Sequence, residues 1–264
     1  MMRSFYSLKG QPFEKSIPTD SLFLSAGFKE LRARLDYLKR NRGLMLLTGE
    51  PGVGKTAALR AFVDSLNPNA YLTVYSPLST VNVLDFYRQI NYHLGGPPKM
   101  RKSELFLAIQ DQVRDYVQNK KKLPVLVLDE AHLLSNDNLN ELQILLNFNM
   151  DSTDPIVFIL CGQSHLRDRF HRPIHESINQ RVRLKYHLTP LSREEMESYL
   201  LHHLALAGRK DSPFNQAALD ALYHNTAGNP RRLNSLVVKT LTLGALEKKR
   251  TLTEEEVFKA SRES

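Results

Sequence analysis

The stretch GLMLLTGEPGVGKT, residues 43–56, constrains the fold of this chain more than any other part of its sequence. Its last eight residues fit the pattern G-x-x-x-x-G-K-[ST], between an apolar segment of strand length and a segment with helical periodicity. Glycines in such a loop let backbone N–H groups surround phosphate oxygens, and the following helix adds the positive end of its dipole. The sequence therefore predicts a phosphate-binding loop at a strand–loop–helix junction.

This loop predicts a site for ATP with Mg²⁺. We expect Lys55 to reach the β- and γ-phosphates and the Thr56 hydroxyl to ligate Mg²⁺. The alternative is a Gly/Pro turn that fits the pattern by chance, and the strand and helix on either side argue against it. The residues expected to contact the nucleotide are Gly49, Glu50, Pro51, Gly52, Val53, Gly54, Lys55, Thr56 and Ala57.

A second apolar segment, LPVLVLDEAHLL at residues 123–134, ends in two carboxylates. With a phosphate loop earlier in the chain, Asp129 is expected to hold the Mg²⁺ shell and Glu130 to polarise the attacking water as general base. The alternative is a buried strand followed by an acidic helix start. His132 completes the letters DEAH and is interpreted as a packing or surface residue. No metal site other than that of the nucleotide-bound Mg²⁺ is expected.

Five apolar runs of strand length alternate with stretches of helical periodicity. Strands that are apolar throughout and alternate with helices are typical of a parallel sheet that is covered on both faces. We therefore expect an α/β P-loop domain with a central parallel sheet. The expected strands are residues 43–49, 70–76, 124–129, 155–162 and 182–188, and expected helices are 57–66, 83–94 and 138–148.

After Leu188 the strand pattern stops and helix signals take over. Ser192 and Glu195 form a capping box, Gly208 is a stop signal, and a helix is expected near residues 216–225. Asn229 with Pro230, and then Thr253 with Glu256, start two more helices. The sequence predicts an N-terminal arm with a first helix (residues 1–42), a nucleotide-binding domain (43–190) and a small all-helical lid domain (191–264).

The composition of the chain indicates which partner and which cellular compartment to expect. The 264 residues carry a net charge of +8, and this excess favours a polyanionic partner such as DNA, RNA or an acidic membrane surface. The single cysteine, Cys161, excludes a disulfide framework and is typical of a reducing cytoplasm. No apolar run approaches the roughly 20 residues that cross a bilayer, and the N-terminus lacks the apolar core of a signal peptide. We expect a cytoplasmic protein without a membrane partner.

The letters DEAH also occur in helicases, but the rest of the chain argues against one. Such a helicase needs two RecA-like domains, and after the acidic motif a Ser-Ala-Thr motif, whereas this chain continues as ILCGQSHL. The sequence instead resembles the AAA+ ATPases over nearly its whole length. The resemblance implies that Gln163, with Ser164 next to it, orients the attacking water. It also implies that Arg181 completes the site of a neighbouring subunit, with Arg167, Arg169 and Arg172 as rivals.

The same resemblance implies that Arg231, with Arg232 beside it, contacts the γ-phosphate. The residues support this role independently. Two arginines in the first turn of a helix lie at the positive end of its dipole, which is unfavourable unless an anion lies near to offset their charge. The alternative is a pair of solvated arginines.

A closer resemblance is to the ExeA/GspA type of AAA+ ATPase. It is carried by FYSLKGQPFEKS, SLFLS, RARLDYLKRNRGLMLLTGEPGVGKT and LTPLSREEMESYLLHHLALAG. In AAA+ proteins the segment before the phosphate loop contributes to the adenine pocket, so the resemblance implies Pro12 and Phe13 for that role, and packing of an N-terminal arm is the alternative.

The resemblance is compatible with two biological roles for ATP hydrolysis, secretion and the regulation of transposition. Secretion-linked members continue into a transmembrane helix and a peptidoglycan-binding region, whereas this chain ends at SRES, just past the expected lid. We therefore expect it to resemble the stand-alone regulators encoded beside transposases (the TniB, TnsC and IstB kind). That resemblance implies an ATP-dependent homo-oligomer, ring or filament, on double-stranded DNA that recruits or activates a transposase. The alternatives are an accessory ATPase of a type II secretion pathway and a non-hydrolysing nucleotide switch.

The best candidate for DNA contact is the loop GGPPKMRK at residues 95–102. Its cations, Lys99, Arg101 and Lys102, suit sequence-independent contact with phosphates. The alternative is a solubilising surface.

Overall fold

The computed structural model describes residues 2–14, 16–77, 80–150 and 152–262. The chain falls into two compact units, and each is described by itself. The sheet unit comprises Glu30–Glu50 and Lys55–Leu188. The helical unit comprises Met1–Lys29, Pro51–Gly54 and Thr189–Ser264, so the middle of the phosphate loop is grouped with the helical unit.

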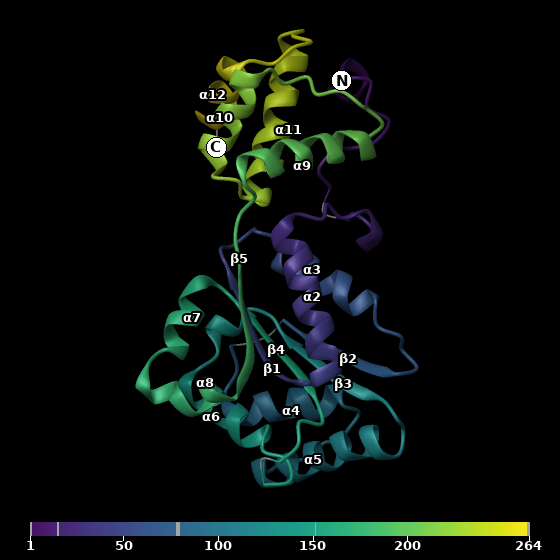
Figure 1. Ribbon diagram of the computed structural model, residues 1–264, viewed down its shortest axis with the longest axis vertical. Helices are drawn as coiled ribbons and strands as arrows, with labels where there is room; N and C mark the ends of the chain where they lie inside the picture. The colour runs from purple at the N-terminus through teal and green to yellow at the C-terminus, as the bar shows by residue number, and fades with distance from the viewer. Residues whose placement is uncertain (1, 15, 78–79, 151, 263–264) are drawn as a thin grey trace. The chain divides into compact units, whose positions relative to one another are not determined.

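The centre of the sheet unit is a parallel sheet, which confirms the predicted fold class (Figure 1). Within the described residues it has five strands in the order β2–β3–β4–β1–β5, and every strand pair is parallel. The predicted bounds of the first and last strands are confirmed, and the other three strands differ from prediction by one or two residues. The strands are β1 Gly43–Gly49, β2 Tyr71–Ser76, β3 Leu123–Leu128, β4 Val157–Gly162 and β5 Val182–Leu188.

Both faces of the sheet are covered: consecutive residues of a strand point to opposite faces, and residues of both sets are buried in the central strands. Leu44 and Leu46 of β1 belong to a core that includes residues of α4, α5 and α6, while Met45 and Leu47 are buried on the opposite face. A run that is apolar at every position is stable only in such a two-sided setting. The helices of this part are α2 Ala26–Asn41, whose residues up to Lys29 are grouped with the helical unit, α3 Lys55–Asp64, α4 Val83–His93, α5 Lys102–Gln118, α6 Asn136–Leu145, α7 Ser164–Phe170 and α8 Glu176–Arg181. Two 3-10 turns, η2 Ala131–Leu133 and η3 Pro173–His175, complete it.

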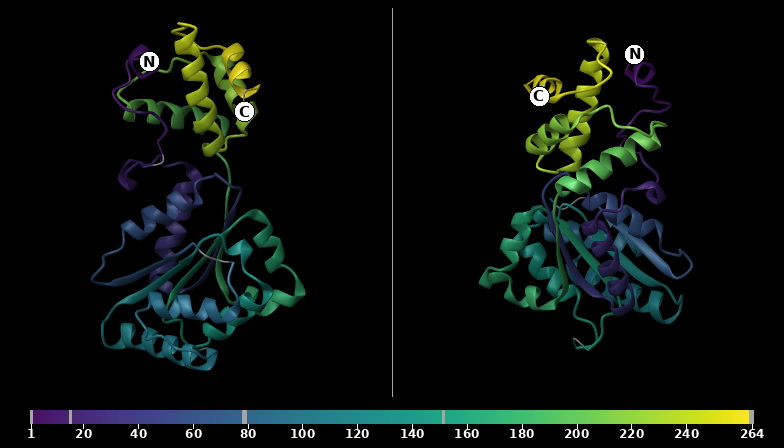
Figure 2. Two further views of the ribbon diagram at one scale, coloured as in Figure 1. Left: turned by 180° about the vertical axis from the view of Figure 1, so that it is seen from behind. Right: turned by 45° about the horizontal axis from the view of Figure 1, so that its top comes forward.

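The helical unit contains both ends of the described chain, and Figure 2 shows its helices packed together without a sheet. Its capping signals are confirmed: Ser192 and Glu195 bond reciprocally, Asn229 caps the helix that Pro230 opens, and Gly208 ends a helix at φ +92°. The helices are α1 Met2–Phe5, α9 Arg193–Leu206, α10 Gln216–Thr226, α11 Pro230–Leu246 and α12 Glu254–Arg262, with a 3-10 turn η1 Thr19–Ser21.

In the part of the chain that the structure describes, no helix has both the length and the apolar character that crossing a membrane requires.

Candidate active site

Lys55 is held at the start of α3 by two carbonyl groups of the phosphate loop. Its Nζ atom donates to the Gly49 oxygen at 2.8 Å and to the Glu50 oxygen at 3.0 Å, and the residue is only 8% exposed. An ammonium group has three N–H donors, so one remains for a ligand. Among the described residues no carboxylate lies within ion-pair distance of it. A buried cation is costly without an anion, and a phosphate oxygen fits this position.

Asp129, directly after β3, is the point where the elements of the sheet unit converge. Its Oδ2 atom accepts hydrogen bonds from the Thr56 hydroxyl at 3.0 Å and from the Tyr75 hydroxyl at 2.9 Å, and its Oδ1 atom accepts from the Glu130 amide at 2.9 Å. The residue is 3% exposed. A threonine hydroxyl beside a carboxylate is a pair of hard oxygen ligands that suits Mg²⁺.

Tyr75 is a residue of this site that the sequence did not reveal. It lies in β2, and its hydroxyl reaches Asp129 because β2 and β3 pair in register, with Ser76 opposite Leu128. Partial burial, reinforced by the hydrogen bond to Asp129, raises the pKa of Tyr75, whose phenol donates to that carboxylate. Burial likewise raises the pKa of the Cys161 thiol on β4, and the nearby Asp129 carboxylate adds to this effect.

Glu130 follows Asp129 with a backbone in the left-handed region, at φ +53° and ψ +30°. Residues other than glycine rarely adopt this conformation, and where they do it is often at a functional site. The side chain of Glu130 is 53% exposed, in contrast to the buried Asp129. Its carboxylate is thus free to act on a solvent molecule.

Gln163 and Ser164 follow β4, the strand between β3 and β1. Because the three strands are parallel, Gln163 lies at the same edge of the sheet as Asp129 and the phosphate loop. Gln163 is the N-cap residue of α7, and the Ser164 hydroxyl donates to the Glu50 carboxylate at 2.5 Å. Ser164 is thereby tied to the phosphate loop.

In the helical unit, Asn229 and Arg231 contact the middle of the phosphate loop. The Asn229 amide donates to the Pro51 oxygen at 2.8 Å, and the Arg231 backbone N–H donates to the Gly52 oxygen at 3.2 Å. A Cβ at Gly52, whose φ is +89°, would lie 2.6 Å from the Cβ of Arg231 and 2.7 Å from the Oδ1 of Asn229. The side chains of Arg231 and the adjacent Arg232 are exposed in the first turn of α11.

Pro12 and Phe13 belong to the N-terminal arm of the helical unit. The ring of Phe13 is 8% exposed and stacks on His203 of α9 with a centroid distance of 5.0 Å. It also lies 6.5 Å from the ring of Tyr199. The arm therefore packs on α9, the alternative that the sequence left open, and a contact of Pro12 and Phe13 with adenine stays a prediction. Lys15 of the same arm lies outside the described residues.

The structure separates the arginines proposed for a neighbouring subunit. Arg169 donates to the oxygens of His132, Leu134 and Asn136 at 2.8–2.9 Å, so its guanidinium fastens α7 to the segment after β3. Arg172 is exposed before η3, and Arg181 ends α8 directly before β5. Arg169 is therefore the least suited of these residues to reach another subunit.

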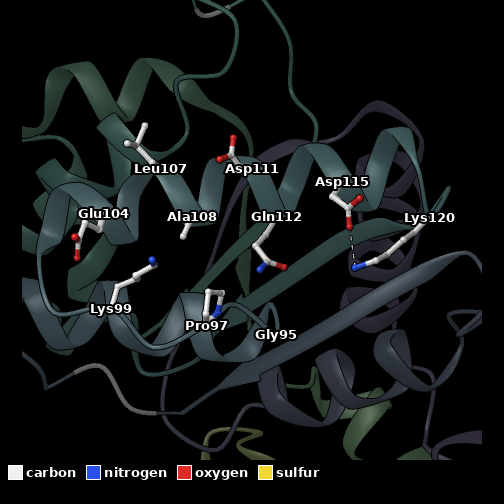
Figure 3. Close-up of a pocket in the computed structure, with 10 residues that line it drawn as sticks. All are labelled: Gly95, Pro97, Lys99, Glu104, Leu107, Ala108, Asp111, Gln112, Asp115 and Lys120. Carbon is white, nitrogen blue, oxygen red and sulfur yellow. Dashed lines mark ion pairs between the residues drawn. The ribbon is translucent and has the colours of Figure 1, made fainter.

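The predicted DNA-contact loop borders a groove of about 630 Å³ (Figure 3). The opposite wall is one face of α5, because its lining residues recur at helical spacing. Figure 3 shows Lys99 across the groove from this face, which carries three carboxylates, and Lys102 forms an ion pair with Glu141 of α6 at 2.7 Å. A contact of Lys99, Arg101 and Lys102 with DNA stays a prediction. The α5 residues that line the groove are Glu104, Leu107, Ala108, Asp111, Gln112 and Asp115.

The residues of the phosphate loop and of the β3 end fit ATP with Mg²⁺. Gly52 and Gly54 have φ values of +89° and +107°, which favour glycine and open the loop backbone toward a ligand. In the sheet unit the fit rests on the buried Lys55 ammonium and on the Thr56–Asp129 oxygen pair. Within the described residues no group of three or more His, Cys, Asp or Glu side chains is arranged to hold another metal ion.

Comparison with known proteins agrees with this geometry. A relative, general secretion pathway protein A of Aeromonas hydrophila, is 29% identical over 248 residues, which are 91% of this chain and 44% of the relative. This chain therefore spans less than half the length of that relative. Two solved structures share the fold. Cdc6p from Pyrobaculum aerophilum has a TM-score of 0.69 at 18% identity, over 95% of this chain and 70% of the other. The Drosophila ORC bound to DNA has a TM-score of 0.67 at 17% identity, over 98% of this chain and 64% of the other.

The model of the family described as AAA domain matches residues 38–170, which are half of the chain and include the phosphate loop, Asp129, Glu130 and Gln163. The chain belongs to the AAA domain family.

Proposed function

We propose that this protein binds ATP with Mg²⁺ and hydrolyses it, with Glu130 as the general base. The observation that carries the proposal is the 3.0 Å contact between the Thr56 hydroxyl and the buried Asp129 carboxylate, with the exposed Glu130 carboxylate next in sequence. A nucleotide-binding protein that acted only as a switch would need the first feature and could dispense with the second. The presence of both supports hydrolysis.

Each side chain has a distinct task in this reaction. Bound Mg²⁺–ATP supplies the phosphoanhydride bond and the metal's charge. Lys55, fixed by two carbonyls, offers its third N–H to the phosphates. Thr56 and Asp129 hold the metal, and Glu130 accepts the proton of the attacking water. We assign Gln163 the orientation of that water and Arg231 a contact with the γ-phosphate.

We further propose that the protein forms a homo-oligomer when ATP is bound. Arg181 is our first candidate for the arginine that acts on a neighbouring subunit, and Arg167 and Arg172, which are both exposed, are its rivals. Residues 1–42, 43–190 and 191–264 are the proposed functional segments: the arm and first helix, the nucleotide-binding domain and the helical lid.

Turnover by the Glu130→Gln variant tests the proposed hydrolysis. We expect its ATP turnover to fall about 100-fold, as for loss of a general base, while a fluorescent ATP analogue binds as it does to the wild type. Lys55→Ala is expected to weaken binding of the analogue itself. Glu254→Gln, at the start of α12, is the control. Equal turnover by the wild type and Glu130→Gln would refute hydrolysis by this residue.

Our first candidate for the biological role of ATP hydrolysis is assembly on double-stranded DNA with regulation of a transposase. The net charge of +8 and the exposed Arg101 of the 95–102 loop support a DNA contact. One structure with the same fold, the Drosophila ORC, is bound to DNA. The fold alone does not assign a partner, so the transposase rests on the resemblance of the sequence.

The second candidate is an accessory role in a general secretion pathway. It is favoured by the 29% identity to general secretion pathway protein A, which extends over 91% of this chain. A secretion role does not require DNA, so DNA binding separates the two candidates.

The test is binding of a labelled DNA duplex at low and at physiological salt, with and without a non-hydrolysable ATP analogue. Regulation on DNA predicts ATP-dependent binding that weakens steeply with salt, DNA-stimulated turnover, and rings or filaments in electron micrographs. Arg101→Glu should weaken binding, and Arg262→Glu in α12 is the control. Absence of binding at low salt in both nucleotide states would refute the DNA role and leave the secretion role.

A further inference from the structure

His132 is buried beside the proposed general base and has an unsatisfied nitrogen. Its side chain is 6% exposed, and its Nδ1 atom has no hydrogen-bond partner among the described residues. The Oε2 atom of Glu130 lies 3.4 Å from it. Buried polar atoms without a partner are rare in folded proteins. The unpaired Nδ1 atom therefore points to the Glu130 carboxylate as its partner, which a small movement of that side chain would bring within hydrogen-bond distance.

The backbone brings the two side chains together. After β3 the chain turns sharply, because Glu130 has a left-handed conformation and Ala131 begins the 3-10 turn η2. This turn leaves the carboxylate of Glu130 next to the imidazole two residues later. A left-handed glutamate is unfavourable by itself, so the surrounding contacts must hold it in place.

The imidazole of His132 is fixed on its other sides. The ring lies edge-on to the ring of His165 in α7, with centroids 4.9 Å apart and an interplanar angle of 90°. The Arg169 guanidinium donates to the His132 carbonyl oxygen at 2.8 Å. At Gly162, a Cβ would lie 3.1 Å from the His132 amide nitrogen, so the missing side chain makes room for this packing. The imidazole is held while the 53% exposed Glu130 side chain is free to turn.

We propose that His132 is a positioning residue for Glu130: its Nδ1–H donates to one oxygen of the carboxylate and leaves the other to accept the proton of the attacking water. The inference rests on the proposed hydrolysis by Glu130. His132 is suited to this task as a neutral donor, since burial lowers its pKa although the Glu130 charge opposes this effect. The role differs from the packing role that the sequence indicated.

The choice of variant distinguishes positioning from packing. The side-chain amide of asparagine lies where Nδ1 of histidine lies, whereas the amide of glutamine reaches the place of Nε2. His132→Asn should therefore keep turnover within about threefold of the wild type, and His132→Gln and His132→Phe should lower kcat about tenfold. The KM for ATP should stay within twofold, because the nucleotide is held by other residues.

His175 provides the matched control. It is also buried in the sheet unit, at 1% exposure, and its Nδ1 atom is also without a hydrogen-bond partner among the described residues. Its Nε2 atom pairs with Asn136 at 3.1 Å. The same three substitutions at His175 should change thermal stability and leave kcat unchanged. If kcat is equally low for His132→Asn and His132→Phe, or unchanged in all His132 variants, the positioning role is wrong.

A second measurement does not depend on turnover. In protein with ¹⁵N-labelled histidine, the Nδ1–H resonance of His132 should shift in the Glu130→Gln variant and stay in place in Glu254→Gln. An unmoved resonance would overturn the pairing even if the wild type hydrolyses ATP. A wild type without ATP turnover would instead overturn the proposed function, and the resonance would still decide whether the two side chains interact.

Discussion

Among single residues, Asp129 shows how a buried carboxylate is kept in one orientation. Donors from distant places in the sequence hold it, among them Thr56 of α3, Tyr75 of β2 and the amide of Glu130. Partners that hydrogen-bond to a metal-holding carboxylate orient it and tune its affinity for the metal. In the proposed Mg²⁺ site Tyr75 takes this role, since its hydroxyl bonds to the same Oδ2 atom as Thr56.

Removing the Tyr75 hydroxyl should therefore weaken metal use without preventing nucleotide binding. For Tyr75→Phe we expect the Mg²⁺ concentration at half-maximal ATP turnover to rise about tenfold, the lower end of what loss of such a partner costs. The control is Tyr71→Phe on the same strand. A Mg²⁺ dependence that is identical in both variants would show that the other partners of Asp129 orient it without the Tyr75 hydroxyl.

Sequence reasoning placed Lys55, Thr56 and Asp129 because their signals are local: a loop pattern and an apolar run that ends in carboxylates. It could not place Tyr75, whose contact with Asp129 exists only because β2 lies beside β3. It offered Arg169 as a residue for a neighbouring subunit because a sequence does not show whether an arginine is exposed to solvent or hydrogen-bonded to oxygens of its own chain, as Arg169 is. Contacts between distant segments depend on strand order, which local patterns do not specify.

At the scale of elements, α11 begins where it does because of a single cap. The Oδ1 atom of Asn229 accepts from the amides of Arg231 and Arg232, and Pro230 opens the helix. The Nδ2 atom of the same side chain donates to Pro51 of the phosphate loop. One side chain therefore starts the helix and also fixes the loop.

Asn229→Ala should separate these two effects when it is compared with Asn215→Ala. Asn215 caps α10 through the Ala218 amide at 2.8 Å and has no part in the phosphate loop. Each substitution should lower the free energy of unfolding by about 1 kcal/mol, the usual cost of losing an N-cap. Only Asn229→Ala should also weaken binding of a fluorescent ATP analogue. Equal analogue affinity in both variants would show that the bond to Pro51 has no role in binding.

Helix α5 shows what a pattern of charges leaves out. The sequence marked Lys99, Arg101 and Lys102 as a basic loop, and it did not mark Glu104, Asp111 and Asp115 as its neighbours. These acids are spaced seven and four residues apart, so they share one face of α5, the face that lines the groove with Lys99. Charge read along the chain differs from charge read across a surface.

For the molecule as a whole, the fold class was the most predictable property. Runs that are apolar at every position, such as Leu44–Leu47, require a sheet covered on both faces, and the alternation of strands with helices requires parallel strands. The helices after Leu188 were predictable because their caps, Ser192 and Asn229, are local signals. The division of the phosphate loop, with Pro51–Gly54 grouped with the helical unit, was not predictable because it depends on distant contacts of Asn229 and Arg231.

His203 should contribute to the pH dependence of the free energy of unfolding, together with the other histidines whose pKa burial lowers, His132, His175 and His187. Burial, with a smaller contribution from His202, lowers the pKa of His203 from 6.5 to about 4. The ring lies between Phe13 and Tyr199, at centroid distances of 5.0 Å and 4.3 Å. Between pH 6.5 and 4 the unfolded chain therefore binds a proton at this residue that the folded chain does not.

Because the unfolded state holds more protons in this window, stability must fall as pH falls from 6.5 toward 4. A shift of this size corresponds to at most about 3 kcal/mol of unfolding free energy, and the contribution is constant above pH 6.5 and below pH 4. Unfolding can be followed by circular dichroism, since the chain has no tryptophan. Measurements between pH 5 and 6.5 avoid the carboxylates, which titrate below about pH 4.5. We expect the slope of the unfolding free energy against pH to diminish in His203→Phe and to persist in His224→Gln on α10. An equal slope in both variants would assign the pH dependence to other groups.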